Sequence, residues 1–428
     1  MAKGRGGTIV HRRNFLRRAG GTLAGLAATG AALRGAAAQD NLLDTLMEQT
    51  QRDQYGQGFD AGSRTVKMPK SSLPTLSPET VATTEQAIGK YEAIAAQGGW
   101  PNVPPSDRLR VGLRHKSVPV LRQRLMAGGD LDVTAGESDV YDTYVERAVR
   151  RFQARHGLGI DGVAHDTTVE AMNIPAAARA NQLKVNLVRL RAMGSSLPPR
   201  LVVCNIPAAQ IEAIQSGVVV TRHAAVVGKP DRASPEINSK IVEINFNPYW
   251  TVPVSIVRKD LIRLMQDNPE YLSQNHIRIF DPKGAELEPS QINWYSQEAV
   301  NYRFKQDPGS FNSLGSIRIN FPSAHGVYMH DTPLKNLFGE DFRFHSSGCV
   351  RVQNVRELVY WLLSETPAWP REEVDRVLQS GERKDARLAK PVPLNWVYIT
   401  AWATPDGIVQ FRDDIYNKDG LGAYAQRT

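Results

Sequence analysis

The sequence lacks the residue spacings that mark a metal site or a nucleotide site. Its 9 histidines are scattered over 428 residues without a His-x-x-x-His pair, and its two cysteines, Cys204 and Cys349, stand far apart. A structural zinc site needs closely spaced ligands, and a phosphate-binding loop needs a glycine-rich turn that opens a helix. Neither pattern is present in the sequence, so we expect no metal and no cofactor.

A long apolar run is also missing. The mildly apolar stretch 20–33 is too short and too rich in Ala and Gly for a transmembrane helix. It follows HRRNFLR at 11–17, which resembles the twin-arginine export motif, and it precedes a small-residue cleavage site at 36–38. We therefore expect a twin-arginine signal peptide at 1–38, a periplasmic location and no stable membrane span after its removal. A disordered basic tail is the alternative.

Acidic residues are absent from the first 38 positions, and this explains the basic character of the chain. The formal net charge is +8, yet residues 1–38 contribute seven Lys and Arg. The remaining residues comprise 45 basic and 44 acidic side chains, so they carry almost no net charge. A nucleic-acid-binding protein carries its basic excess on the binding surface. We therefore expect no nucleic-acid partner.

The N-terminal half is expected to be helical after a linker. Residues 39–79 are polar, with scattered Gly, Ser and Pro and little periodicity, so we expect a flexible linker there. Apolar residues at helical spacing then recur in three segments: 80–97, 106–174 and 176–193. The length of the whole chain suggests two or three domains.

From residue 200 the pattern changes to short β-rich runs with Gly or Pro breaks. The expected strands are 201–206, 211–215, 218–227, 241–246, 317–321, 326–329, 396–402 and 408–411. The expected helices in this half are 255–266, 355–363 and 371–379. The fold class that follows is multidomain α+β, with a mostly β part after a helical part.

The two cysteines differ in their surroundings. Cys204 lies in an apolar, strand-like run and is typical of a buried structural residue, whereas Cys349 follows Ser-Ser-Gly and precedes Val-Arg-Val. His330 lies 19 residues before Cys349, and an imidazole beside a thiol is a usual means of forming the nucleophilic thiolate. Gly348 allows close backbone approach, and its amide with that of Cys349 is suited to a developing oxyanion. Local composition alone leaves a functional and a structural Cys349 equally open.

The stretch 327–354, VYMHDTPLKNLFGEDFRFHSSGCVRVQN, resembles the active-site signature of the L,D-transpeptidases with the YkuD-type catalytic domain. In that family a His precedes, by a little under twenty residues, a Ser/Thr-His-Gly-Cys segment that an Arg often follows. Here His330 matches the first His, Gly348 and Cys349 match the nucleophile pair, and Arg351 matches the Arg. Ser347 replaces the frequent second His, as the long periplasmic branch of the family tolerates, so His330 is the only motif-matched base.

The resemblance extends to the rest of the chain. Residues 106–174 resemble a three-helix peptidoglycan-binding module, through LRxG at 109–112, AVxxFQ at 148–153 and GLxxDG at 157–162. In the long branch such a module is inserted between two halves of a helical scaffold, which here are 80–105 and 175–198. The catalytic domain is then 200–420, and about 258–320 of it forms a lid subdomain. Whether this module binds glycan or only serves the architecture stays open.

The resemblance implies an acyltransferase that forms 3→3 crosslinks in peptidoglycan through a Cys349 thioester. Its partners are peptidoglycan stem peptides and glycan, and we expect a monomer with both thiols free, since a disulfide would block Cys349. His330 takes up the thiol proton, and its imidazolium is expected to lower the thiol pKa. The Gly348 and Cys349 amides, with Tyr328, are assigned to the oxyanion.

The remaining roles and alternatives are less specific. Arg351 either holds a stem carboxylate or serves the local structure, Ser347 fixes the loop, and His345, which is off the motif, is expected to be a local structural or surface residue. An L,D-carboxypeptidase or an enzyme that attaches proteins to peptidoglycan would use the same acyl-enzyme. A non-catalytic wall-binding protein is the third possibility.

Overall fold

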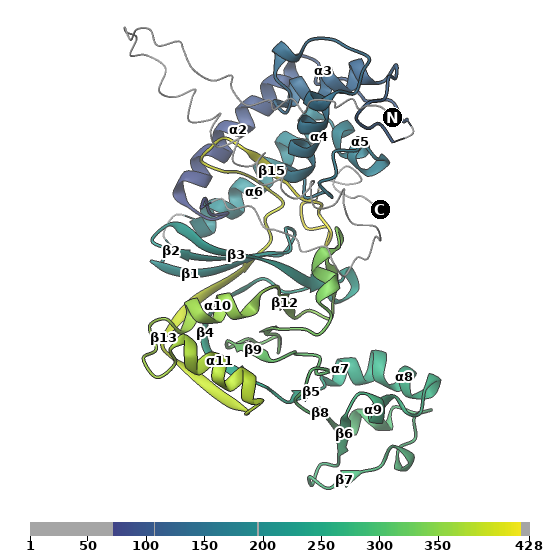
Figure 1. Cartoon of the computed structure of the whole chain (residues 1–428), viewed down its shortest axis with the longest axis vertical. Coiled ribbons are helices and arrows are strands. Elements are labelled where there is room, and N and C mark those ends of the chain that lie inside the picture. The colour runs from purple at the N-terminus through teal and green to yellow at the C-terminus, as the bar shows by residue number, and fades with distance from the viewer. Residues whose placement is uncertain (1–71, 107, 195–196, 421–428) are drawn as a thin grey trace, which may run out of the picture.

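The computed structural model describes residues 72–106, 108–194 and 197–420 (Figure 1). The expected signal peptide, 1–38, and most of the expected linker lie outside these residues. The end of that linker packs against the molecule, because the Thr75 amide donates to Glu212 at 2.8 Å and Leu76 is fully buried beside Leu190 and Leu201. The structure therefore differs from a flexible linker over this last stretch.

The helical part occupies one end of the long axis of the molecule (Figure 1). Its helices are α2 Pro78–Ala96, α3 Val118–Gly128, α4 Thr143–Arg155, α5 Asp166–Asn173 and α6 Ala176–Gly194, with a short 3₁₀ helix η2 at Val133–Ala135. All five α-helices coincide with segments in which apolar residues recur at helical spacing. The expected helices of this half are therefore confirmed.

Helices α2 and α6 pack along each other although 79 residues separate their facing ends. Helix α2 begins at Pro78, where the Ser77 hydroxyl accepts the Thr80 amide at 3.0 Å and caps the first turn. Ile88 and Tyr91 of α2 pack with Leu183 of α6 in one buried cluster. Helices α3, α4 and α5 lie between α2 and α6 in the sequence and share a separate core.

The strands form a nine-stranded sheet in the order β11-β3-β12-β10-β9-β4-β13-β1-β2. Its members are β1 Arg200–Asn205, β2 Gln210–Gln215, β3 Val218–Gly228, β4 Ile237–Phe246, β9 Ile317–Asn320, β10 Met329–His330, β11 Phe344–Ser346, β12 Val350–Val352 and β13 Lys384–Val397. Strand β2 also pairs with β3, so the sheet closes into a ring. A separate hairpin of β14 Ala401–Ala403 and β15 Val409–Phe411 follows.

Both faces of β1 are buried, against different partners. Val202 and Cys204 enter the large core beneath α10 Val355–Leu363 and α11 Arg371–Ser380, whereas Leu201 and Val203 pack toward α6. Continuous burial of this kind explains the unbroken apolar run of the strand. In Figure 1, strands β1, β2 and β3 lie between the helical part and α10.

A small unit with its own core covers the other end of the molecule (Figure 1). Its four-stranded sheet has the order β5-β8-β6-β7, from β5 Trp250–Thr251, β6 Ile277–Phe280, β7 Glu286–Leu287 and β8 Arg303–Gln306. Its helical pieces are α7 Val254–Ile256, the π-helix η4 Val257–Leu261, α8 Ile262–Asp267, α9 Tyr271–Gln274 and the 3₁₀ turns η5 Pro289–Gln291 and η6 Glu298–Asn301. We call this unit, residues 250–306, the covering unit.

Three sequence-based strands have wrong boundaries. The expected strand 326–329 is only β10 at Met329–His330, β4 starts at Ile237 instead of 241, and the expected strand 396–402 spans the end of β13 and the start of β14. The sequence predicted a strand that starts at Trp396, whereas β13 starts at Lys384 and ends at Val397. Strand β13 alternates buried apolar residues such as Ala386 and Leu394 with exposed charged residues, and its pairing with β4 shifts between Arg387 and Val392. Two prolines near that shift, at 391 and 393, obscure the alternation in the sequence.

Candidate active site

The candidate nucleophile and the candidate base lie on neighbouring parallel strands. Strand β10 pairs with β12 so that Met329 stands opposite Val350 and His330 opposite Arg351. The Val350 amide donates to the Tyr328 carbonyl at 3.1 Å, which continues the pairing to Tyr328 and Cys349. Because side chains alternate along a strand, Tyr328, His330, Cys349 and Arg351 share one face of the sheet.

Hydrogen bonds hold the turn before Cys349 in one shape. The Ser346 hydroxyl accepts the Gly348 amide at 3.1 Å and donates to the Cys349 carbonyl at 2.5 Å. The Ser234 hydroxyl donates to the Gly348 carbonyl at 2.9 Å. Gly348 has φ +111°, a conformation that other residues rarely adopt, so the turn requires glycine at this position.

These contacts change the expected role of Gly348. Its amide is already engaged by Ser346, so it does not stand free for an oxyanion as the sequence suggested. Ser347 is exposed, and its hydroxyl accepts a hydrogen bond from Arg232 at 3.0 Å. The Gly348 and Ser347 contacts therefore fix the loop that carries Cys349.

His330 is a buried, neutral imidazole. Its Nδ1 lies 2.5 Å from the Asp331 carbonyl oxygen, and because a carbonyl only accepts, Nδ1 carries the proton and Nε2 keeps its lone pair. Burial first, and then the nearby charge of Arg351, lowers the pKa of His330 to about 3. The imidazole is thus a proton acceptor at neutral pH and is not charged.

Cys349 is likewise neutral in the resting structure. Burial raises the pKa of its thiol, while hydrogen bonds from Tyr328 and the charges of Arg318 and Arg351 act in the opposite direction. Burial therefore opposes both charged forms of the expected thiolate–imidazolium pair in the resting structure. The thiol and the imidazole project from the same face of the sheet, and burial favours the neutral form of each.

Tyr328 links this pair to the covering unit. Its hydroxyl contacts the Cys349 thiol and accepts a hydrogen bond from Trp250 Nε1 at 3.2 Å. Its ring meets the His330 ring edge to face, with 5.7 Å between centroids. Burial raises the pKa of Tyr328 well above its ordinary value, so its hydroxyl stays protonated and can donate.

Arg318 belongs to the same face and was not found from the sequence. It stands directly opposite His330 on β9, and its guanidinium lies 4.3 Å from the Tyr328 ring centroid. Arg351, His330 and Arg318 therefore form one row across β12, β10 and β9, which we call the Arg–His–Arg row. The alternation of Ile317, Arg318 and Ile319 predicts an outward side chain, but only strand register places it beside the thiol.

The other candidates lie apart from this cluster. Cys204 is fully buried, burial raises its thiol pKa, and both cysteines are free, as expected. The exposed His345 lies 2.7 Å from a Glu340 carboxylate oxygen and 2.8 Å from the Phe342 carbonyl through the same Nε2. Its side chain is engaged on the surface, which agrees with the expected structural role.

The described residues hold neither a metal-binding cluster nor a membrane-spanning helix. Among residues 72–106, 108–194 and 197–420 no group of His, Cys, Asp and Glu is arranged to hold a metal ion. In the same part of the chain, no helix combines the length and the apolar character needed to cross a membrane.

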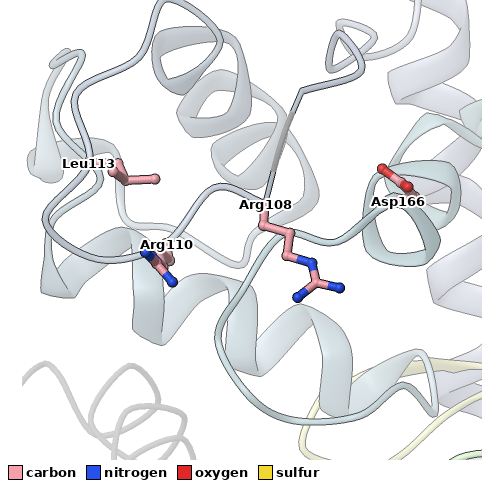
Figure 2. A pocket seen from close by; sticks show the side chains of 4 residues that line it. All are labelled: Arg108, Arg110, Leu113 and Asp166. Carbon is pink, nitrogen blue, oxygen red and sulfur yellow. The ribbon is translucent and has the colours of Figure 1, made fainter.

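A cavity of about 460 Å³ lies on the helical part, far in sequence from Cys349. Figure 2 shows the side chains of Arg108, Arg110, Leu113 and Asp166 around it. Arg108 and Arg110 flank Leu109, which is buried and bridges to Ala164, so the two arginines project away from the core. The cavity is therefore polar and basic on one side.

Comparison with known families finds one matching stretch in each half of the chain. Residues 199–373 match the model of the L,D-transpeptidase catalytic domain, YkuD, and residues 114–172 match the model of a peptidoglycan-binding domain. A curated Haemophilus influenzae protein, named with a provisional assignment as an L,D-transpeptidase, is 32% identical over 252 residues. That match covers 58% of this chain and 50% of the relative, so the chain spans about half the length of the relative.

Solved L,D-transpeptidases share low identity with the chain. One from Mycobacterium smegmatis is 14% identical, with 46% of this chain and 58% of that chain covered and a TM-score of 0.24. One from Stackebrandtia nassauensis is 11% identical, with 69% and 97% covered and a TM-score of 0.26. These scores are too low to transfer site geometry. The two domain matches and the curated relative nevertheless agree: residues 199–373 are similar to the L,D-transpeptidase catalytic domain, YkuD, and residues 114–172 to a peptidoglycan-binding domain.

Proposed function

We propose that this protein is a cysteine-dependent L,D-transpeptidase that forms 3→3 crosslinks in peptidoglycan. The observation that carries the proposal is that Cys349 and His330 project from the same face of two neighbouring strand segments, within the residues that match the catalytic domain. The donor is a tetrapeptide stem, and the attacked carbonyl belongs to the L-centre of its third residue. The acceptor is the side-chain amine of another stem.

The first half-reaction forms a thioester. The Cys349 thiol passes its proton to Nε2 of His330 as the sulfur attacks the carbonyl carbon. The Cys349 amide and the Tyr328 hydroxyl stabilise the oxyanion, since the Gly348 amide is engaged by Ser346. Collapse of the tetrahedral intermediate breaks the peptide bond, and the imidazolium returns its proton to the leaving D-Ala amine.

The second half-reaction releases the enzyme. The acceptor amine attacks the thioester carbon and gives its proton to Nε2 of His330. As the new amide bond forms the carbon–sulfur bond breaks, and the imidazolium returns the proton to the leaving sulfur, which restores the neutral thiol and imidazole. The low pKa of His330 favours the proton-donating half of this cycle, because a buried imidazolium gives its proton readily to a leaving group, and it opposes uptake of the thiol proton. The hydrogen bond from Nδ1 to Asp331 keeps the ring in the required tautomer.

The remaining features of the proposal concern location and partners. An enzyme that acts on peptidoglycan works outside the cytoplasmic membrane, and the twin-arginine motif at 11–17 supports export to the periplasm. The basic cavity at Arg108 and Arg110 is the part of the helical module that we assign to contact with the wall (Figure 2). The assigned ligand there is peptidoglycan glycan, and the protein acts as a monomer.

Incubation with purified tetrapeptide muropeptides, followed by mass analysis, tests the proposed reaction. We expect crosslinked dimers and released D-Ala from the wild type and none from Cys349→Ser, because an alcohol is a much weaker nucleophile than a thiol at neutral pH. Cys204→Ser is the matched control and should retain activity. Shortened monomers without dimers would show that the enzyme hydrolyses the donor peptide and does not transfer it. Turnover by Cys349→Ser would refute the mechanism.

A further inference from the structure

Two arginines beside the active site have no anionic partner. Arg351 and Arg318 flank His330 from the strands on either side. The Nε atom of each is buried without a hydrogen-bond partner, and within the described part of the chain neither guanidinium forms an ion pair. Burial lowers the pKa of Arg351, which shows that the site disfavours an unpaired cation.

Three other buried or half-buried arginines of this protein are paired with carboxylates, whereas the buried Arg124 and Arg343 donate to backbone carbonyls. Arg155 binds Asp130, Arg222 binds Glu212, and Arg232 binds Asp260. Removing a guanidinium from water without a counter-charge is costly, so structures normally supply one. On the neighbouring strand β4, Arg318 stands opposite Asn245, and the Glu243 carboxylate two positions away accepts hydrogen bonds from Asn245 and Asn320.

We propose that Arg318 and Arg351 together bind the terminal carboxylate of the donor peptide. This inference rests on the proposed function, and it names the part of the donor that the Arg–His–Arg row recognises. The bound group is the carboxylate of the residue that leaves when the thioester forms. Arg318 is the residue that this proposal newly assigns to substrate specificity.

The spacing of the row favours the leaving residue over other carboxylates of the stem. In a tetrapeptide the terminal carboxylate lies one residue beyond the attacked carbonyl, which is roughly 3.5 Å of extended chain. Arg351 lies two positions after Cys349 on β12, and both side chains leave the same face of the sheet. Two neighbouring strand spacings separate Arg318 from Arg351 by roughly 10 Å, a gap that two long side chains can close around one carboxylate.

A consequence for specificity follows. Guanidinium groups bind carboxylates through paired, charge-assisted hydrogen bonds, and these fix position as well as adding affinity. A donor that ends one residue past the attacked carbonyl places its carboxylate between the arginines. A donor with one further residue presents a neutral amide at that point and leaves both guanidinium groups unpaired.

The test compares two synthetic tetrapeptide donors, one with a free C-terminal carboxylate and one with a C-terminal amide. The measured quantity is the rate of thioester formation on Cys349 of the full-length protein, followed by intact mass spectrometry. A third donor, amidated only on the side-chain carboxylate of its third residue, separates the two possible sources of the anion. The protein variants are Arg318→Gln, Arg318→Lys and the control Arg387→Gln, which removes an exposed arginine of β13 in the same sheet.

We expect the wild type and Arg387→Gln to react about 10- to 100-fold faster with the free carboxylate than with the amide, the range of one or two charged hydrogen bonds. In Arg318→Gln this ratio should fall to about 1 to 5, mainly through the donor with the free carboxylate. Arg318→Lys should retain a part of the preference, because it keeps the charge without the planar fork.

Three results would overturn the inference. The first is equal rates of the wild type with the free acid and the terminal amide. The second is an equal slowing of Arg318→Gln with both donors, which a purely structural arginine would produce. The third is a preference that depends on the side-chain carboxylate instead. The wild-type comparison needs no variant, so it holds even if Arg318→Gln fails to fold. A lack of thioester with every donor would instead refute the proposed function itself.

Discussion

At the scale of single residues, burial decides the charge state of the candidate catalytic pair. His330 is buried and Cys349 is half-buried, so each prefers its neutral form, and the two flanking arginines oppose protonation of the imidazole further. A family motif indicates which residues meet, but it does not indicate whether they rest as a neutral pair or as an ion pair. The difference is visible in the pH dependence of thiol reactivity.

Replacement of His330 by Ala should separate reactivity of the thiol from turnover. Because His330 is uncharged near neutral pH, its removal should leave the pH midpoint of Cys349 alkylation within about half a unit of the wild type. That midpoint should lie above the ordinary thiol value of ~8.5, since burial raises the thiol pKa. Crosslinking should fall by about 10²–10⁴-fold, the usual contribution of a general base. Iodoacetamide labelling from pH 6 to 10 and muropeptide turnover are the measurements.

The matched control for this experiment is His345→Ala, which removes an exposed histidine of the same segment. It should change neither the alkylation midpoint nor turnover. A wild-type midpoint below 8.5 that moves upward in His330→Ala would mean that a thiolate–imidazolium pair forms after all.

At the scale of elements, the sequence predicts the parts of the site that are local in the chain. The segment around Cys349 and His330 is recognisable because the motif residues stand at fixed separations, and α10 begins and ends where its apolar spacing predicts. Arg318 could not be predicted in the same way. It reaches the site through the pairing of β9 with β10, and register between separate strands is not encoded in any short stretch.

The covering unit shows the same limit. The predicted helix 255–266 is present as α7, the π-helix η4 and α8, but the π-helical turn has no simple sequence signal. That turn carries Asp260, whose carboxylate pairs with both terminal nitrogens of Arg232. Arg232 also donates to Ser347, so one side chain joins the covering unit to the loop of Cys349.

Asp260→Asn should loosen the covering unit without unfolding the protein. The Arg232–Asp260 pair is largely shielded on the arginine side, with 13% of that side chain exposed, so its loss should cost on the order of 1 kcal/mol locally. Hydrogen–deuterium exchange should become faster in residues 250–306 and in the loop at Ser347, with little change in β1 or β4. The measurement is peptide-level exchange followed by mass spectrometry.

A matched control lies on the next helix. Asp267 of α8 pairs with Arg263 at 3.8 Å, and both side chains are mostly exposed. Asp267→Asn should therefore leave exchange unchanged, because exposed pairs contribute little. Equal exchange in the wild type and Asp260→Asn would show that apolar contacts alone seat the covering unit.

At the scale of the whole molecule, the hairpin of β14 and β15 packs against two separate parts of the helical region, α2 and the end of α4. Phe411 of β15 packs with Tyr91 of α2 at 5.5 Å between ring centroids and with His156, which follows α4, at 5.4 Å. Arg412 donates to the Arg155 carbonyl at 3.1 Å. Tyr91 and Phe411, which are some 320 residues apart in the sequence, therefore share one core.

Phe411→Ala should weaken the junction between the helical module and the rest of the protein. The side chain is 1% exposed, and loss of a buried Phe typically costs about 3–5 kcal/mol because a cavity remains. We expect the urea midpoint of unfolding, followed by tryptophan fluorescence, to fall, and proteolysis within 108–173 to become faster.

Phe342→Ala is the control, since that ring is 48% exposed and its loss should shift the midpoint little. Thioester formation on Cys349 should persist in folded Phe411→Ala, because Phe411 packs against α2 and α4 and the thiol directly precedes β12. An unchanged midpoint would show that β15 only lies against the helices and does not stabilise them.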